Sequence, residues 1–142
     1  MQELYTFSLN HWELVAAFLL TLIMLIFNIF GDRLRGFESI TPEAAVRVLN
    51  ADNSLLIDVR TKDELKKDGH IQDAKHIPLN QLKDKLGDLG AHRNSNVAVI
   101  CRSGSRSGVA CGQLKKSGFE QVYNLKGGIL SWKSAGLPVS YK

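Results

Sequence analysis

The sequence lacks the features that mark several common functional classes. Its 142 residues contain only two cysteines, Cys101 and Cys111, and a helix that begins just after Cys101 would hold them too far apart for a disulfide. The net charge of +4 is dispersed, without the runs of like charge that are typical of nucleic-acid partners. Neither a phosphate-binding glycine motif nor a dinucleotide fingerprint is present, and His70 and His76 are not spaced like metal ligands. We therefore expect no cofactor, no metal and no nucleic-acid partner.

Charge is missing altogether from one long stretch. Residues 14–31 contain no charged side chain, and the run LVAAFLLTLIMLIFNIF is almost wholly apolar. As a helix it would extend roughly 25 Å, close to the thickness of a hydrocarbon core, and Trp12 before it suits a membrane interface. The sequence therefore predicts a short tail over 1–12, a transmembrane helix over 13–31 and a linker over 32–40.

Two alternatives to a membrane anchor are disfavoured. A cleaved signal peptide would need a basic start, a shorter apolar stretch and a small-x-small site. A core helix of so small a domain would not be apolar on every side. Arg33 and Arg35 follow the stretch, whereas no Lys or Arg precedes it, so the positive-inside rule predicts a single-pass protein with its tail outside and its domain in the cytoplasm. Two unpaired thiols also fit a reducing compartment.

The remainder, residues 41–142, alternates between apolar strands and helical stretches. Thr41 and Pro42 are typical of a helix start, and strands are predicted over 54–60, 74–79, 96–101 and 121–128. This alternation predicts an α/β domain, with a mostly parallel sheet of about five strands and helices on both faces. In such sheets ligands bind beyond the carboxyl ends of the strands, which is where Cys101 falls.

The segment VICRSGSRSG leaves a buried strand and turns into a polar loop. Glycine and serine allow successive N–H groups to point inward and bind an anion. Arg102 and Arg106 add positive charge, and a helix expected from about Ser105 adds its amino terminus; both features lower the pKa of a thiol. The alternative, a structural cysteine, is accepted for Cys111, which shares a helix face with apolar neighbours, but not for Cys101.

Three segments resemble the single-domain rhodanese family: LLIDVRTKDELKKDGHIQDAKHIPL, VICRSGSRSG and VYNLKGGILSWKSAGLPV. The resemblance covers about residues 37–141, and with the apolar segment the chain resembles the membrane-attached rhodaneses of Gram-negative bacteria. This likeness implies a location at the bacterial inner membrane. It implies a doubly wound α/β fold and a sulfurtransferase in which Cys101 takes sulfur from thiosulfate as a persulfide and passes it to a thiol or cyanide.

The resemblance also assigns roles around this cysteine. Asp58 matches a carboxylate that we expect to brace the loop, whereas Gly127, Gly128 and Trp132 match a closing motif expected to serve packing. The partners implied are a small sulfur-containing anion or a thiol or persulfide protein, together with membrane lipid. The active loop that would bind the donor and stabilise the persulfide comprises Cys101 and the five residues Arg102, Ser103, Gly104, Ser105 and Arg106.

Two other functions share part of this pattern. A cysteine-dependent phosphatase carries Cys-x5-Arg, but position 107 holds serine and the arginine comes one residue earlier, which disfavours phosphate chemistry. The second is a membrane-tethered adaptor that uses a rhodanese fold to bind a membrane protein or a sulfur-handling protein. That alternative stays open at this point.

Overall fold

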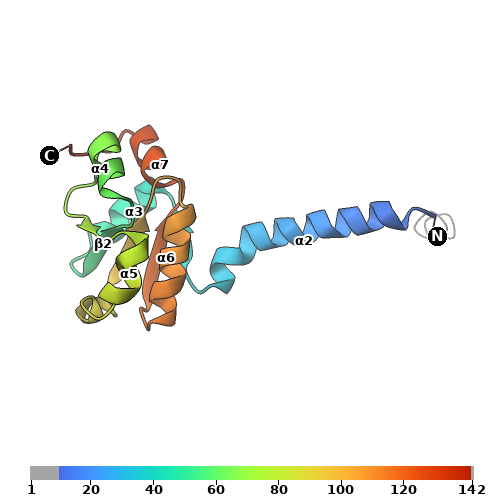
Figure 1. Cartoon of the computed structure of the whole chain (residues 1–142), viewed down its shortest axis with the longest axis horizontal. Coiled ribbons are helices and arrows are strands. Elements are labelled where there is room, and N and C mark those ends of the chain that lie inside the picture. The colour runs from blue at the N-terminus through green and yellow to red at the C-terminus, as the bar shows by residue number, and fades with distance from the viewer. Residues whose placement is uncertain (1–9, 142) are drawn as a thin grey trace. The chain divides into compact units, whose positions relative to one another are not determined.

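The computed structural model describes residues 10–141, apart from the side chains of residues 28 and 33. The chain divides into two compact units between Leu34 and Arg35. The first contains the helix α2 (Trp12–Leu34) and the second contains the α/β domain (Figure 1). Of the predicted tail over 1–12, residues 1–9 lie outside the described residues.

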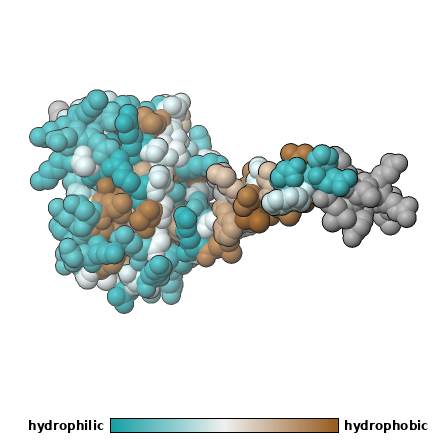
Figure 2. Space-filling view, turned by 45° about the vertical axis from the view of Figure 1, so that its right-hand side comes forward, coloured by the Kyte–Doolittle hydropathy of each residue, from teal (hydrophilic) through white to brown (hydrophobic). Residues whose placement is uncertain are grey.

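Helix α2 covers the apolar stretch and the start of the predicted linker. Its large apolar side chains are exposed, with Phe18 at 66% and Met24 at 76%, and hydrophobic surface extends over much of the helix in Figure 2. Nevertheless, among the described residues no helix combines the length and the hydropathy needed to cross a membrane. The transmembrane helix predicted over 13–31 is therefore not confirmed.

The sheet of the second unit has five strands, and every neighbouring pair is parallel. The predicted α/β class and parallel sheet are thus confirmed. The strand order is β1-β5-β4-β2-β3, which places β4 and its carboxyl end at the centre. The strands are β1 (Glu38–Ile40), β2 (Ser54–Asp58), β3 (Lys75–His76), β4 (Asn96–Ile100) and β5 (Gln121–Leu125).

Helices cover both faces of this sheet, because the central strands are apolar on both sides (Figure 1). Val97 and Val99 of β4 face one core with α5 (Leu79–Lys85) and α6 (Ser105–Lys116). Ala98 and Ile100 face the other core with α3 (Pro42–Leu49) and α7 (Gly128–Ser134). Helix α4 (Lys62–Asp68) follows β2, and a 3-10 turn (Gly90–His92) precedes β4.

Two predicted boundaries differ from the structure. Residues 38–40, predicted as part of a linker, form the edge strand β1 beside β5. The sequence did not indicate this strand, because three residues are too few to show an alternating pattern. The strand predicted over 74–79 is reduced to Lys75–His76, and Leu79 already starts α5. The helix start at Thr41 is confirmed, since its hydroxyl oxygen accepts a hydrogen bond from the Ala44 amide at 3.4 Å.

Candidate active site

The candidate site is the loop between β4 and α6, at the carboxyl end of the central strand. The strand ends at Ile100 and the helix begins at Ser105, so the chain must reverse within four residues. Gly104 makes this possible with a φ of +98°, in the region that favours glycine. A Cβ there would also lie 3.2 Å from the Gly127 amide nitrogen. The loop therefore has one tightly packed conformation.

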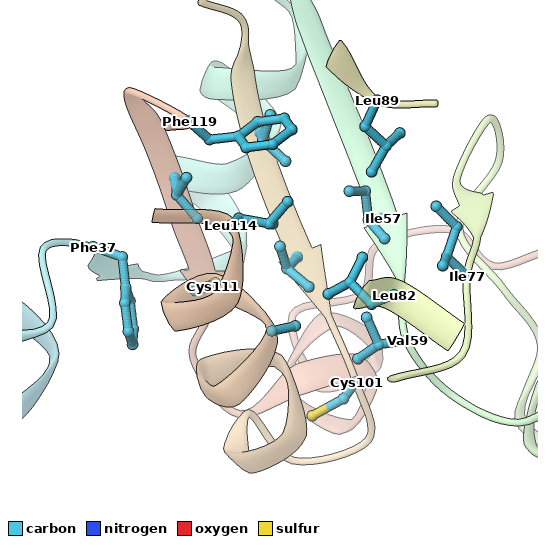
Figure 3. Packing of buried hydrophobic residues seen from close by; sticks show 14 residues of the cluster. Phe37, Ile57, Val59, Ile77, Leu82, Leu89, Cys101, Cys111, Leu114 and Phe119 are labelled. Atoms are coloured by element: carbon cyan, nitrogen blue, oxygen red, sulfur yellow. The ribbon is translucent and has the colours of Figure 1, made fainter. Parts of the chain in front are cut away.

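The sulfur of Cys101 accepts two hydrogen bonds inside this loop. The Gly104 amide donates from 3.1 Å and the Ser107 hydroxyl from 3.2 Å, and Cys101 as a whole is only 1% exposed. In Figure 3 the Cys101 sulfur lies beside the first turn of α6. The side chain is thus held between the loop backbone and the helix start.

Opposing effects act on the pKa of the Cys101 thiol, and the hydrogen bonds outweigh burial. Burial raises the pKa, because the charged form loses its hydration. The Ser107 hydroxyl and the amides of Ser107, Ser103 and Gly104 lower it, and the net pKa is below the ordinary value. The loop therefore favours the thiolate, which is the nucleophilic form.

Sequence reasoning missed Ser107 as a site residue. Its side chain is fully buried and points at the Cys101 sulfur. In the sequence, Ser107 entered only as the residue that replaces a phosphatase arginine. The position of Ser107 in the first turn of α6 could have indicated this role, because a hydroxyl there can reach back to the loop that precedes the helix.

Neither of the two predicted arginines is among the groups that donate a hydrogen bond to the Cys101 sulfur. Arg102 is exposed, and Arg106 pairs with Glu64 through hydrogen bonds of 2.8 and 2.5 Å. The hydrogen bonds to Glu64 are the main reason why the Arg106 pKa is raised, and the charge of Cys101 raises it less. Hydrogen bonds, rather than the guanidinium groups, are therefore the main source of the lowered Cys101 pKa.

Glu64 was also missed by the sequence analysis. It is the third residue of α4 and forms a capping box with Thr61, whose amide and hydroxyl both donate to its carboxylate. The hydrogen bond from Arg106 is the main cause that lowers the Glu64 pKa to about 2. One carboxylate thus fixes the start of α4 and also the orientation of Arg106.

The remaining loop residues, Ser103 and Ser105, are both exposed. The backbone amide of Ser103 contributes to the lowered Cys101 pKa. The structure gives the Ser105 side chain no hydrogen bond to the sulfur; this residue instead starts α6. The predicted loop residues are therefore brought together around Cys101, but mainly by their backbone.

Asp58 braces a neighbouring segment rather than the loop itself. Its carboxylate accepts hydrogen bonds from the Arg60 side chain at 2.7 to 3.1 Å, and both residues are fully buried. Arg60 also donates to the Gly69 carbonyl oxygen at 2.8 Å. Sequence reasoning missed Arg60, because an arginine at a strand end usually lies at the surface.

Two further elements hold the loop backbone in place. The Ile129 amide of α7 donates to the Cys101 carbonyl oxygen at 2.9 Å, and a Cβ at Gly128 would lie 2.4 Å from the same oxygen. The Asn124 side chain of β5 donates to the Gly104 carbonyl oxygen at 3.2 Å. The Gly127-Gly128 pair therefore allows α7 to approach the loop closely.

A groove of about 340 Å³ opens beside the loop and is lined by Val59, Thr61, Pro78, Leu79, Asn80 and Arg106. A second hollow of about 400 Å³ lies between α3 and the segment that follows α7, and its lining includes none of the loop residues. The first groove is the one that shares Arg106 with the active loop.

The histidines have structural surroundings. His76 Nε2 lies 2.7 Å from the Arg60 carbonyl oxygen, and the His70 backbone pairs with Ser140. In the part of the chain that the structure describes, no three His, Cys, Asp or Glu side chains are grouped so that they could hold a metal ion. Neither cysteine forms a disulfide.

Comparisons with known proteins agree on one family. The profile described as Rhodanese-like domain matches residues 41–135. A protein named sulfurtransferase from Allochromatium vinosum is 37% identical over 93 residues, covering 66% of this chain and 84% of that protein. YibN of Escherichia coli K12, named as uncharacterized, is 29% identical over 140 residues, covering 98% and 97%. The crystal structure of a rhodanese-related protein from Thermoplasma volcanium matches with a TM-score of 0.66 and 33% identity, covering 75% of this chain and all of that one.

Proposed function

Because the chain belongs to the rhodanese-like domain family, we propose that it is a sulfurtransferase that carries sulfane sulfur as a persulfide on Cys101. A sulfur-transfer role is supported by relatives that are named sulfurtransferase. The donor is thiosulfate or a persulfide, and the acceptor is a thiol or cyanide. The observation that carries the proposal is the pair of hydrogen bonds from Gly104 and Ser107 to a sulfur with a lowered pKa.

The reaction proceeds in two displacements. The Cys101 thiolate attacks the outer sulfur of thiosulfate, a new S–S bond forms, and the old S–S bond breaks so that sulfite leaves with the electron pair. An acceptor thiolate then attacks the outer sulfur of the Cys101 persulfide, which restores the Cys101 thiolate. Covalent catalysis of this kind divides one transfer into two steps.

The surrounding residues have separate roles in these steps. The amides of Ser103 and Gly104, together with the Ser107 hydroxyl, stabilise negative charge on sulfur in both steps. Arg102, which is exposed, attracts an anionic donor to the loop. Arg106 lies at the edge of the loop, where the ion pair with Glu64 fixes its side chain.

Sulfite release from thiosulfate by the full-length chain tests this function. We expect activity in the wild type and in Cys111→Ser, and its complete loss in Cys101→Ser. Intact-mass analysis after thiosulfate treatment should show one added sulfur that dithiothreitol removes, in the wild type but not in Cys101→Ser. Persistence of either signal in Cys101→Ser would refute the role given to this sulfur.

The location of the protein is part of the proposal: we place it at the bacterial inner membrane, attached to lipid through α2, with the sulfurtransferase domain in the cytoplasm. The exposed apolar side chains of α2 support this placement. Sedimentation with membranes, resistance to an alkaline wash and protease access from either side test it. Recovery of the full-length chain in the fraction without membranes would refute it.

The same exposed helix favours a second candidate, in which the protein is a tethered adaptor for a membrane protein or a sulfur-handling protein. Cross-linking and deletion complementation separate the two functions. An adaptor would retain its partners and complement a deletion as Cys101→Ala. A sulfurtransferase would lose complementation in that variant.

A further inference from the structure

We propose that the groove beside the active loop binds the carbon skeleton of a small, uncharged organic thiol, which donates or accepts the sulfane sulfur at Cys101. The inference rests on the proposed function and adds the class of its organic substrate. The groove is the one lined by Val59, Thr61, Pro78, Leu79, Asn80 and Arg106. We call it the thiol groove.

The thiol groove lies close to the reactive sulfur. Val59 lines the groove and belongs to the same buried cluster as Cys101, and Figure 3 shows the two side chains next to each other. Arg106 lines the groove from the active loop itself. A molecule whose carbon atoms occupy the groove can therefore place a thiol group at the loop.

The size and lining of the thiol groove favour an organic molecule. Its volume of about 340 Å³ is at the lower end of the range for small-molecule sites. Val59, Pro78 and Leu79 provide apolar surface, and such surface gains free energy when it is covered by carbon atoms rather than by water. Thiosulfate has no carbon skeleton, so it cannot use this part of the site.

The charge of the thiol groove favours an uncharged skeleton. Among the described residues that line the groove, Arg106 alone is charged, and two nitrogens of its guanidinium group donate to the Glu64 carboxylate. This ion pair cancels most of the attraction that Arg106 would exert on an anion. Asn80, the polar residue on α5, is neutral and exposed.

The transfer balances without any oxidant or reductant. In the loading direction, the Cys101 thiolate attacks the outer sulfur of R–S–SH. The Cys101–sulfur bond forms, the R–S to sulfur bond breaks, and R–S⁻ leaves with the electron pair and then takes up a proton from water. In the unloading direction, R–S⁻ attacks the outer sulfur of the Cys101 persulfide, giving R–S–SH and the Cys101 thiolate.

The test is a comparison of two acceptors with the full-length chain and thiosulfate as donor. 1-Thioglycerol is an uncharged organic thiol, whereas cyanide is too small to need the thiol groove. Asn80→Trp places a large side chain in the groove. Gln81→Trp places the same side chain at the next position of α5, which is also exposed but does not line the groove. Both positions are exposed, so both variants should fold, and circular dichroism verifies this.

We expect Asn80→Trp to lower the ratio of kcat/KM for 1-thioglycerol to that for cyanide by about tenfold, as for the loss of a well-fitted apolar contact. Gln81→Trp should keep the wild-type ratio. An unchanged ratio in Asn80→Trp, or an equal fall in both variants, would overturn the thiol groove while leaving Cys101 chemistry intact. If the wild type forms no persulfide by intact mass, the proposed function itself fails.

Discussion

Removing the hydroxyl of Ser107 should shift the ionisation of Cys101 more than any other single-atom change in the loop. The Ser107 hydroxyl donates to the sulfur from 3.2 Å, and both residues are buried, so water cannot replace the lost donor. A hydrogen bond to a charged group is worth about 1.5–3 kcal/mol. Because about 1.4 kcal/mol corresponds to a factor of ten, Ser107→Ala should reduce the thiolate-to-thiol ratio of Cys101 about tenfold or more at a given pH.

The assay is the rate of Cys101 alkylation as a function of pH, with the modified residue identified by mass spectrometry. In Ser107→Ala the pKa of the Cys101 thiol rises, so the half-maximal rate moves to higher pH, and the thiolate still forms in alkaline solution. Ser105→Ala is the matched control. It is the same serine-to-alanine substitution in the same region, but the Ser105 side chain is exposed and makes no hydrogen bond to the sulfur. If Ser107→Ala and Ser105→Ala give the same pH profile as the wild type, the ionisation of Cys101 does not depend on this hydroxyl and our account of the loop is wrong.

Two further predictions concern the elements that hold the loop. Gly128→Ala should lower both the stability and the rate of Cys101 alkylation, because the new Cβ would lie 2.4 Å from the Cys101 carbonyl oxygen. Gly136 has a similar positive φ, but no atom lies near the position of its Cβ. Gly136→Ala should therefore lower only the stability, by about 1 kcal/mol in urea unfolding. Glu64 has a folded pKa of about 2 against an ordinary 4.5, so its contribution to stability is present above about pH 4.5 and is lost as the pH falls toward 2. Glu64→Gln should therefore be less stable than the wild type at neutral pH and approach it in acid, which urea unfolding at several pH values would show.

The fold was predictable where local patterns determine it. The apolar runs at 55–57 and 97–100 form the central part of two neighbouring parallel strands, because a strand covered on both faces is mostly apolar. Helix starts at Thr41 and Thr61 follow from side-chain oxygens that accept from the first amides. The edge strand β1 was not predictable, since its three residues acquire their role only by pairing with β5, far away in the sequence.

The candidate site was predictable in position but not in detail. Cys101 and the loop lie where a parallel sheet places its ligands, at the carboxyl end of the central strand. The pairing of Arg106 with Glu64 joins residues 42 positions apart, and the burial of Arg60 depends on the Gly69 carbonyl oxygen. No local pattern shows either contact. The sequence predicted inward-pointing amides and two arginines acting together on Cys101, but it could not show that the neutral donors have the larger effect on the Cys101 pKa.

The larger effect of the neutral donors, compared with the arginines, changes what controls the ionisation of the Cys101 sulfur. Free arginines would attract the donor and ionise the thiol through the same charge, so salt would weaken both effects together. Here the thiolate is stabilised mainly by buried neutral donors of the loop, which salt screens little, while Arg102 remains exposed to the solvent. Sulfur ionisation therefore depends on the loop conformation that Gly104, Ile129 and Asn124 hold. Donor attraction depends on a separate surface charge, so the two properties can change independently by mutation.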